Sequence, residues 1–299
     1  MNRTAVVTAG TGGIGLETAS GLARAGFAVT VVGRDAGRGA QAVEQINAAG
    51  AAHPARFLAA DLGSLDQVRM LAARITDAHP ELTVLVNNVG AMFPDRQERD
   101  GVEASFVVNH LSPYLLTELL LPALAAGAPS RVVNVTSGAV VAAKRVFDAA
   151  EPPGGYYGFH WYGRAKLANL AYTLDLAARL DGTGVSVFAA DPGGAATGMT
   201  DGTMTDPKIV SPALRLLWPL VRRRFERSTS GPASAAARSS VVAATDEALK
   251  GRTGVVIGPH GGPAAPFRVA TDPRIADAVR ALSERHAPLT RPQLDGRSG

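Results

Sequence analysis

The feature that most constrains the fold is an alternation: short apolar, β-branched runs are followed by longer segments with helical periodicity. Apolar strands separated by helices are typical of a parallel sheet that is covered on both faces. The expected strands are 4–8, 28–32, 55–60, 83–86, 131–135, 184–190 and 254–257, and the expected helices are 14–25, 37–49, 65–78, 106–124 and 161–180. The pattern predicts one doubly wound α/β domain of about seven strands over residues 1–290.

Two segments depart from this rhythm. Residues 193–233 are rich in Gly, Thr and Pro and then become helical, which predicts a lid insertion over the edge of the sheet. Residues 291–299 are polar and contain Pro, Gly and Ser, so we expect a flexible tail.

Composition excludes several classes of function. The formal net charge is only +4 and basic residues are interspersed with acids, so no nucleic-acid partner is expected. The chain has no cysteine, which rules out disulfides and thiolate metal sites, and no metal site is predicted. The N-terminal residues lack a secretory pattern, and 212–221 is too short to span a bilayer. We expect a cytoplasmic protein without stable membrane insertion, which at most touches a bilayer through Leu214–Val221.

A glycine-rich turn, Thr8-Ala-Gly-Thr-Gly-Gly-Ile-Gly15, joins the first expected strand to the first expected helix. Glycines at such a turn let the backbone approach a pyrophosphate, which the helix N-terminus attracts through its free N–H groups and dipole. Within a βαβ unit the turn predicts a Rossmann-type dinucleotide site. The candidate contacts in the turn are Gly10, Thr11, Gly13, Ile14 and Gly15.

The end of the second strand, Val31-Val-Gly-Arg-Asp35, indicates which dinucleotide binds. Gly33 leaves room for a 2′-phosphate and Arg34 supplies a bidentate partner for it, so NADP(H) is predicted in preference to NAD(H). The alternative is that Arg34 is a surface charge and Asp35 only caps the next helix. Further cofactor contacts are predicted where the third and fourth strands end, at Asp61, Leu62, Asn88, Val89 and Gly90.

Tyr162 and Lys166 stand four residues apart in a predicted helix. Residues at this spacing share one helix face, so a phenol and an ammonium could act on the same small volume. Taken alone, the spacing is more typical of a surface lysine near a half-buried tyrosine than of a catalytic pair.

Over residues 4–197 these motifs together resemble the short-chain dehydrogenases/reductases. Thr8 and Gly13–Gly15 resemble the family's TGxxxGIG loop, and Asn88-Val-Gly90 is similar to its NAG motif. The family's Asn-Ser-Tyr-Lys tetrad is matched by Asn109, Ser137, Tyr162 and Lys166, and its nicotinamide-contacting segment by Pro192, Gly193 and Thr197. The finer resemblance is to retinol-dehydrogenase-like and carbonyl-reductase-like members. Ala9 departs from the loop's usual first glycine, and Asp191 stands where that branch often has histidine.

The resemblance implies a hydride-transfer reaction with four assigned side chains. Tyr162 would be the acid in carbonyl reduction or the base in alcohol oxidation, with its pKa lowered by Lys166 and by the positive nicotinamide ring. Ser137 would hold the substrate oxygen, and Asn109 would help to place Lys166. Tyr162 and Lys166 would also contact the cofactor. The family further implies a homodimer or homotetramer through helices 106–124 and 161–180.

Six of the sixteen aromatic residues fall between positions 147 and 162, beside the candidate tyrosine. This crowding predicts an apolar wall for a hydrophobic ketone or secondary alcohol, aromatic or polycyclic as in secondary metabolism; the alternative is that the rings only pack the segment onto the domain. The candidate substrate contacts are Phe147, Tyr157 and Trp161, with Met199 and Trp218 in the lid. Reduction of an activated C=C bond, or a non-catalytic dinucleotide-binding sensor or scaffold, remain alternatives.

Overall fold

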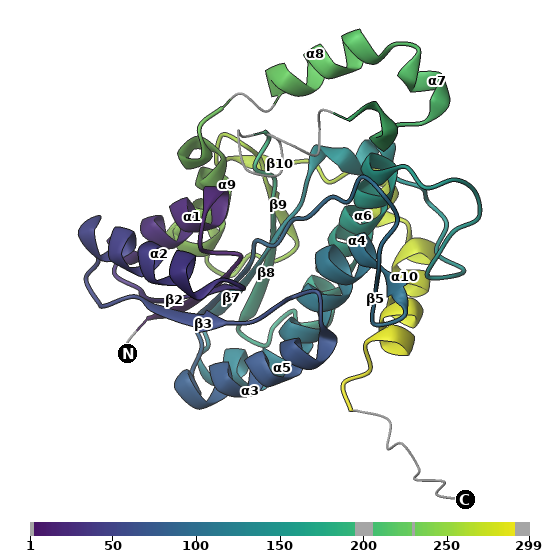
Figure 1. Ribbon diagram of the computed structural model, residues 1–299. Helices are drawn as coiled ribbons and strands as arrows, with labels where there is room; N and C mark the ends of the chain where they lie inside the picture. The colour runs from purple at the N-terminus through teal and green to yellow at the C-terminus, as the bar shows by residue number, and fades with distance from the viewer. Residues whose placement is uncertain (1–2, 195–205, 229–230, 291–299) are drawn as a thin grey trace, which may run out of the picture.

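A computed structural model describes residues 3–194, 206–228 and 231–290, and its centre is one eight-stranded sheet (Figure 1). The strand order is β10-β9-β8-β7-β4-β1-β2-β3, and every neighbouring pair is parallel except β9 and β10. The strands are β1 Thr4–Thr8, β2 Ala28–Gly33, β3 Arg56–Ala59, β4 Val84–Asn87, β7 Ser130–Val135, β8 Val185–Ala190, β9 Val255–Ile257 and β10 Pro263–Ala264. The predicted fold class is confirmed.

The strand that the prediction lacked is β10, which has only two residues and therefore no detectable alternation of its own. It turns back on β9 through a tight loop in which the amide of Gly258 donates to the carbonyl of Gly262. A separate hairpin, β5 Glu98–Arg99 with β6 Val102–Glu103, was also too short to predict.

Helices cover both faces of the sheet (Figure 1). Helices α1, α2 and α9 pack on one face and α3, α5, α6 and α10 on the other, each over its own apolar core. The main helices are α1 Gly13–Arg24, α2 Ala36–Ala48, α3 Leu65–Ala78, α5 Ser112–Ala126, α6 Gly158–Arg179, α8 Trp218–Ser228, α9 Ala233–Thr245 and α10 Pro273–His286. Short helical turns are α4 Ala104–Phe106, α7 Pro212–Arg215 and the 3₁₀ segments Gly138–Ala142, Pro207–Ile209, Glu247–Leu249 and Arg268–Thr271.

The helix predicted over 106–124 is not uniform. It begins as α4, widens into a π-helix over Val107–Leu111 and continues as α5. π-Helical turns are rare and frequently occur at functional sites, because the extra residue per turn re-aims a side chain. Here the π-turn contains Asn109, one member of the predicted tetrad.

The order of the strands locates the crevice of the sheet. The chain builds outward from β1 through β2 to β3, and then returns to β4 on the other side of β1. Loops that leave the carboxyl ends of two such strands diverge to opposite faces, which opens a crevice between them. The glycine turn after β1 and the Asn88–Gly90 segment after β4 therefore border the same opening.

The predicted lid segment 193–233 is described in part. Residues 195–205 lie outside the described residues, and Thr197 and Met199 are among them. Beyond that gap, α7 and α8 form an arm that stands off the body of the molecule (Figure 1), whereas α9 packs against α1. Within the ranges that the structure describes, no helix is long and apolar enough to cross a membrane.

Candidate active site

Tyr162 and Lys166 are both buried on α6 and meet at the carboxyl edge of the sheet. The ammonium of Lys166 donates to the backbone carbonyls of Val89 and Val135, each at 2.9 Å. Gly90 lies directly beside the pair, since a Cβ at that position would be 3.8 Å from the phenol oxygen of Tyr162 and 4.0 Å from Nζ of Lys166. The spacing of four residues thus brings both polar groups to one point.

Ser137 lies next to this pair at the end of β7. It forms a hydrogen bond with the phenol of Tyr162, and its hydroxyl accepts from the amide of Ala139 at 3.2 Å. Two hydroxyls that converge in this way can both bind one oxygen atom of a ligand.

Burial shifts the pKa values of the pair in opposite directions. Burial raises the pKa of Tyr162 to about 12; the hydrogen bond with Ser137 opposes this shift and the carboxylate of Asp191 adds to it. Burial lowers the pKa of Lys166 to about 7. The protein by itself therefore does not produce the depressed tyrosine pKa that was expected from Lys166, because desolvation disfavours the charged form of both side chains.

Asn109 is fully buried in the π-turn and fastens the loop that follows β4. Its side-chain oxygen accepts from the amide of Ala91 at 2.9 Å, and its side-chain nitrogen donates to the carbonyls of Ala91 and Ser105, both at 2.8 Å. The same loop carries Val89, whose carbonyl accepts from Lys166. Asn109 therefore influences the position of Lys166 indirectly, by holding the loop that carries both Ala91 and Val89.

A cavity of about 780 Å³ extends from this pair to the glycine turn. It brings together most of the predicted cofactor residues: Thr11, Gly13, Ile14, Arg34, Asp61, Leu62, Asn88, Val89, Gly90, Tyr162, Lys166, Pro192 and Gly193. Ser137 and Asp191 line it as well.

Gly10 and Gly15 lie behind the wall of the cavity, where they allow close packing. A Cβ on Gly15 would be 2.2 Å from the carbonyl oxygen of Ala9, and one on Gly10 would be 2.8 Å from Cγ1 of Val31. Gly13 and Ala9 adopt φ values of 52° and 50°. Ala9, the departure seen in the sequence, thus occupies a left-handed conformation that glycine adopts more easily.

The far end of the cavity is basic. Gly33 has no room for a side chain, since a Cβ there would lie 2.7 Å from Thr11, and Arg34 and Arg38 line the opening beside it. Asp35 caps α2 by accepting from the amide of Arg38 at 2.7 Å, so the capping role is confirmed while Arg34 still borders the cavity. Arg38 was missed by the sequence reasoning. It could have been found in the sequence from its position four residues after Arg34, which places it in the first turn of α2.

At the nicotinamide-side end of the predicted site, Asp191 follows β8. One of its carboxylate oxygens accepts from the amide of Gly193 at 2.9 Å, and burial raises the pKa of this carboxyl. A carboxylate thus borders the cavity close to Tyr162.

Three of the predicted substrate residues lie outside this cavity. Phe147 is buried, and the guanidinium of Arg164 lies 4.7 Å from the centre of its ring. Trp161 is buried as well, with the centre of its ring 5.1 Å from that of Tyr156. Tyr157 is the residue that precedes α6. None of the three lines the cavity that holds Tyr162; Phe147 instead borders a second hollow of about 710 Å³ beside α10.

The apolar lining near Tyr162 comes from residues that were not predicted as substrate contacts: Met92, Phe93, Val108 and Phe159. Trp218 packs, partly buried, against the cluster of Met92, Ala139, Tyr162, Ile209 and Val210. Met92 and Phe93 could have been found in the sequence, because they follow Asn88-Val-Gly90 after one residue and therefore leave the same strand end. Among the residues that the structure describes, no three His, Asp or Glu side chains are grouped to hold a metal ion.

Comparisons with known proteins agree with this geometry. The sequence profile of the short chain dehydrogenase family matches residues 3–208. Retinol dehydrogenase 12 of Mus musculus is 37% identical over 227 residues, which cover 76% of this chain and 69% of that protein. The chain matches only 51–61% of the length of further curated relatives, among them retinol dehydrogenase 13 of Homo sapiens.

Two solved structures extend the comparison to the fold. An uncharacterised protein from Mycobacterium paratuberculosis superposes with a TM-score of 0.72 at 29% identity, covering 97% of this chain and 95% of that one. The active-site complex of Pseudomonas aeruginosa RhlG with NADP gives a TM-score of 0.65 at 28% identity, covering 87% and 95%. With the profile match over more than half of the residues, these results show that the chain belongs to the short-chain dehydrogenase/reductase family, in its retinol-dehydrogenase-like branch.

Proposed function

We propose that the protein is an NADP(H)-dependent oxidoreductase that interconverts a hydrophobic ketone and its secondary alcohol, with Tyr162 as acid and base. One observation carries the proposal: a single cavity joins the buried Tyr162–Lys166–Ser137 group to a glycine turn that is flanked by Arg34 and Arg38.

The residues of the turn suit a dinucleotide. Gly12 precedes α1 without a side-chain cap, so the first N–H groups of the helix are available to a pyrophosphate. A Cβ on Gly12 would lie 2.9 Å from the guanidinium of Arg38, so the glycine lets this arginine lie close to the turn. Arg34 and Arg38 together would pair with a 2′-phosphate. The relative RhlG, which was solved with NADP, is consistent with this choice.

The bound cofactor would supply or accept the hydride, and the protein handles the proton. In the reductive direction Tyr162 donates its phenolic proton to the substrate oxygen as that oxygen gains charge, while Ser137 donates a hydrogen bond to the same atom. Lys166, which is held by the carbonyls of Val89 and Val135, stabilises the phenolate that remains. Asn109 fixes the loop that supplies one of these carbonyls.

An apolar substrate is supported by the lining of the cavity. Met92, Phe93, Val108 and Phe159 surround the side of the cavity near Tyr162, and apolar linings with few polar groups suit a bulky ketone. Trp218 on the arm would close this side from outside. The names of the relatives, retinol dehydrogenases, agree with a large apolar alcohol or carbonyl compound.

Cofactor choice is tested by fluorescence titration with NADPH and NADH. We expect NADPH to bind more tightly, and Arg34→Ala and Arg38→Ala each to weaken NADPH binding by about 10–100-fold, because each removes a charge-assisted hydrogen bond worth about 1.5–3 kcal/mol. NADH binding should change little. Arg24→Ala, an exposed arginine at the end of α1, is the control. Equal affinity for both nucleotides would contradict the NADP(H) assignment.

Catalysis is tested by following NADPH oxidation with a panel of bulky aromatic and polycyclic ketones. Tyr162→Phe should lower turnover by about 10²–10⁴-fold, as expected for the loss of a general acid, while NADPH affinity stays within about twofold. Tyr157→Phe is the matched control, since its ring lies outside the cavity. Near-normal turnover in Tyr162→Phe would reject the assignment. Turnover of activated enones alone would assign C=C reduction instead, and NADPH binding without turnover of any substrate would favour the sensor.

A further inference from the structure

The arm formed by α7 and α8 exposes three large apolar side chains within five residues. Leu216, Leu217 and Leu220 are 86%, 53% and 63% exposed. In the described part of the chain the other exposed large apolar side chains are Met70, Val141, Val146 and Leu289. Single exposed apolar residues are ordinary, whereas a contiguous group of them marks an interaction site.

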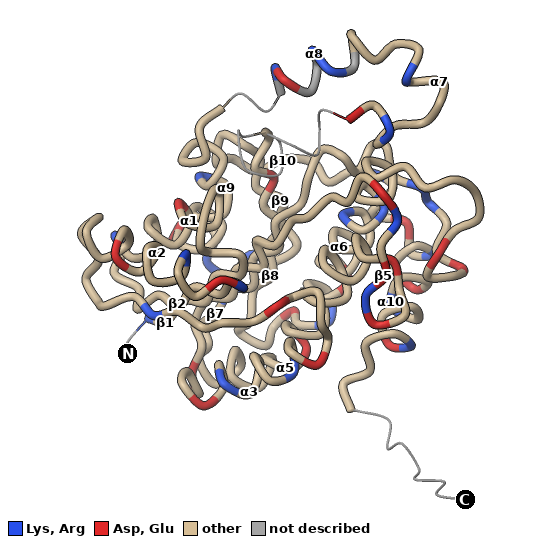
Figure 2. Tube along the Cα trace, viewed as in Figure 1, with Lys and Arg blue, Asp and Glu red and all other residues tan. Residues whose placement is uncertain are grey.

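Positive charge accompanies this apolar group. The sequence of α8 contains four arginines and one glutamate, a formal charge of 4 − 1 = +3. Leu220, Arg223 and Arg227 follow one another at i, i+3 and i+7, so they share one face of the helix. Both arginines are exposed, and Figure 2 shows basic residues on α8 at the outer edge of the molecule. We define Leu216, Leu217, Leu220, Arg223 and Arg227 as the arm patch.

The arm connects the arm patch with the candidate active site. On its inner side, Leu214 and Trp218 pack against the cluster that includes Tyr162 and Met92. The arm is held at its base by Arg215, which donates to the carbonyls of Pro207 and Val210, both at 3.1 Å. The same element therefore packs against the cluster that contains Tyr162 and carries exposed leucines and arginines on an arm that stands off the body of the molecule (Figure 1).

We propose that the arm patch is a peripheral docking surface for a membrane that contains anionic phospholipids. The leucines enter the interface between headgroups and acyl chains, and Arg223 and Arg227 pair with headgroup phosphates. An arm that carries both exposed leucines and basic residues matches an anionic lipid surface in charge and in polarity. Together with the proposed function, such docking brings apolar substrates dissolved in the membrane near the side of the molecule that carries Tyr162.

The test is flotation of the full chain with vesicles of phosphatidylcholine alone and of phosphatidylcholine mixed with phosphatidylglycerol. We expect binding to the mixed vesicles, weaker binding to the neutral ones, and release by salt, because screening shortens the reach of the arginine charges. The triple variant Leu216→Ser/Leu217→Ser/Leu220→Ser should lower the partition coefficient at least about tenfold. Arg223→Gln/Arg227→Gln should lower it by about tenfold on mixed vesicles only.

Matched controls separate docking from misfolding and from nonspecific attraction. Met70→Ser/Leu289→Ser removes exposed apolar side chains elsewhere, and Arg24→Gln/Arg285→Gln removes two exposed charges; both should bind like the wild type. All variants should keep the NADPH affinity of the wild type, and vesicle binding is measured without any substrate, so a failure of the proposed reaction leaves this result intact. Absence of vesicle binding by the wild type, or undiminished binding by the leucine variant, would overturn the proposal. Self-association that the leucine variant abolishes, without vesicle binding, would also overturn it and assign the arm patch to a protein contact.

Discussion

At the scale of single residues, the candidate site depends on burying Lys166 among backbone carbonyls. The ammonium donates to two backbone carbonyls at 2.9 Å, and no carboxylate contributes to the shift of its pKa. Burial therefore dominates and lowers its pKa to about 7.

This shift predicts a pH dependence of stability. Between pH 7 and pH 10 the unfolded chain holds a proton on Lys166 that the folded chain has released, so the free energy of unfolding rises with pH over this window. Relative to Lys166→Met, the wild type should gain up to about 1.4 kcal/mol per pH unit in urea denaturation. Above pH 10 the free energy of unfolding of the wild type itself should fall again. The cause is the raised pKa of Tyr162, because the tyrosine of the unfolded chain then loses its proton first.

The comparison with Lys166→Met isolates the lysine from the other titrating groups. A difference in unfolding free energy that stays constant from pH 7 to pH 10 would show that Lys166 titrates in the folded protein as it does in the unfolded chain.

At the scale of elements, α6 does more than carry the tyrosine and the lysine. Arg164, 1% exposed on this helix, donates to the carbonyls of Val146, Ala149 and Ala150 at 2.8–2.9 Å. Its guanidinium also lies 4.6 Å from the ring of Phe106 and 4.7 Å from that of Phe147. α6 thereby anchors the long segment between β7 and itself, which explains why that aromatic-rich stretch packs inward.

Removal of Arg164 should loosen this segment. Arg164→Ala leaves three carbonyls without their donor and opens a gap between two rings, so we expect a loss of about 3 kcal/mol or more in unfolding free energy. Arg145→Ala, an exposed arginine in the same segment, should change it by less than about 0.5 kcal/mol. Equal effects of the two substitutions in urea denaturation would contradict this account of the anchor.

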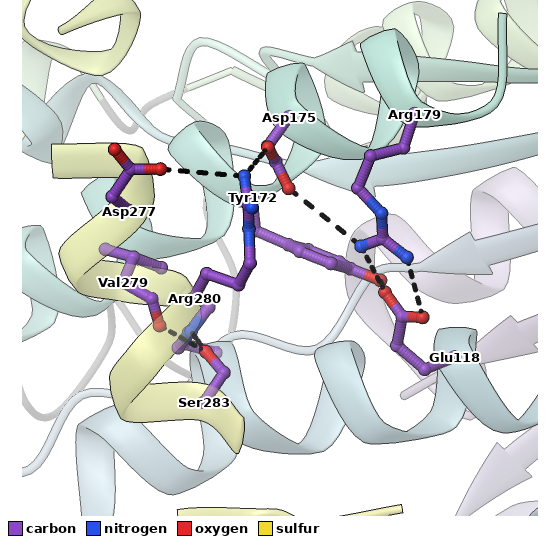
Figure 3. A network of polar contacts seen from close by, with 9 residues as sticks. Glu118, Tyr172, Asp175, Arg179, Asp277, Val279, Arg280 and Ser283 are labelled. Atoms are coloured by element: carbon purple, nitrogen blue, oxygen red, sulfur yellow. Dashed lines mark hydrogen bonds and ion pairs between the residues drawn. The ribbon is translucent and has the colours of Figure 1, made fainter. Parts of the chain in front are cut away.

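At the scale of the whole molecule, α10 packs beside α6 (Figure 3). Arg280 pairs with Asp175, and Ser283 shares a hydrogen bond of 2.7 Å with His110. Beside them, Glu118 of α5 accepts from Tyr172 at 3.1 Å and pairs with Arg179 at 2.8 Å. Helices α5, α6 and α10 thus form one layer, although α10 comes from the far end of the chain.

The buried apolar side chains of α10 should contribute more to the free energy of unfolding than its ion pairs do. Leu282 is 2% exposed, so Leu282→Ala should cost about 2–4 kcal/mol of unfolding free energy. Arg280 is 42% exposed at its side chain, and Arg280→Ala should cost less than about 1 kcal/mol, because exposed ion pairs gain little over hydration. Thermal unfolding of the two variants measures which substitution destabilises the protein more. A larger loss of stability in Arg280→Ala than in Leu282→Ala would contradict this prediction.

The position of α10 also bears on assembly. The homodimer or homotetramer predicted through helices 106–124 and 161–180 would have to use the part of α6 that α10 leaves free. Light scattering of the full chain measures this directly, and it stays a prediction until then.

The local pattern of the chain was sufficient to predict seven strands of the sheet, five of its helices and the glycine turn, whereas α9 and α10 were not predicted and the Tyr162–Lys166 pair was singled out only by the resemblance to the family. The predicted elements depend on short-range periodicity: apolar runs form strands, a spacing of four shares a helix face, and glycines mark a close turn. The departure at Ala9 was visible in the sequence as well, although only the structure shows its left-handed backbone.

Only the tertiary structure decided which aromatic residues face the candidate site. Phe147 and Trp161 are near Tyr162 in the sequence but pack into the core, because Arg164 and Tyr156 hold them there. Met92 and Phe93 are far from Tyr162 in the sequence but leave β4 at the same edge of the sheet. β10, the π-turn at Asn109 and the docking of α10 likewise depend on contacts between distant segments, and a local pattern carries no record of such contacts.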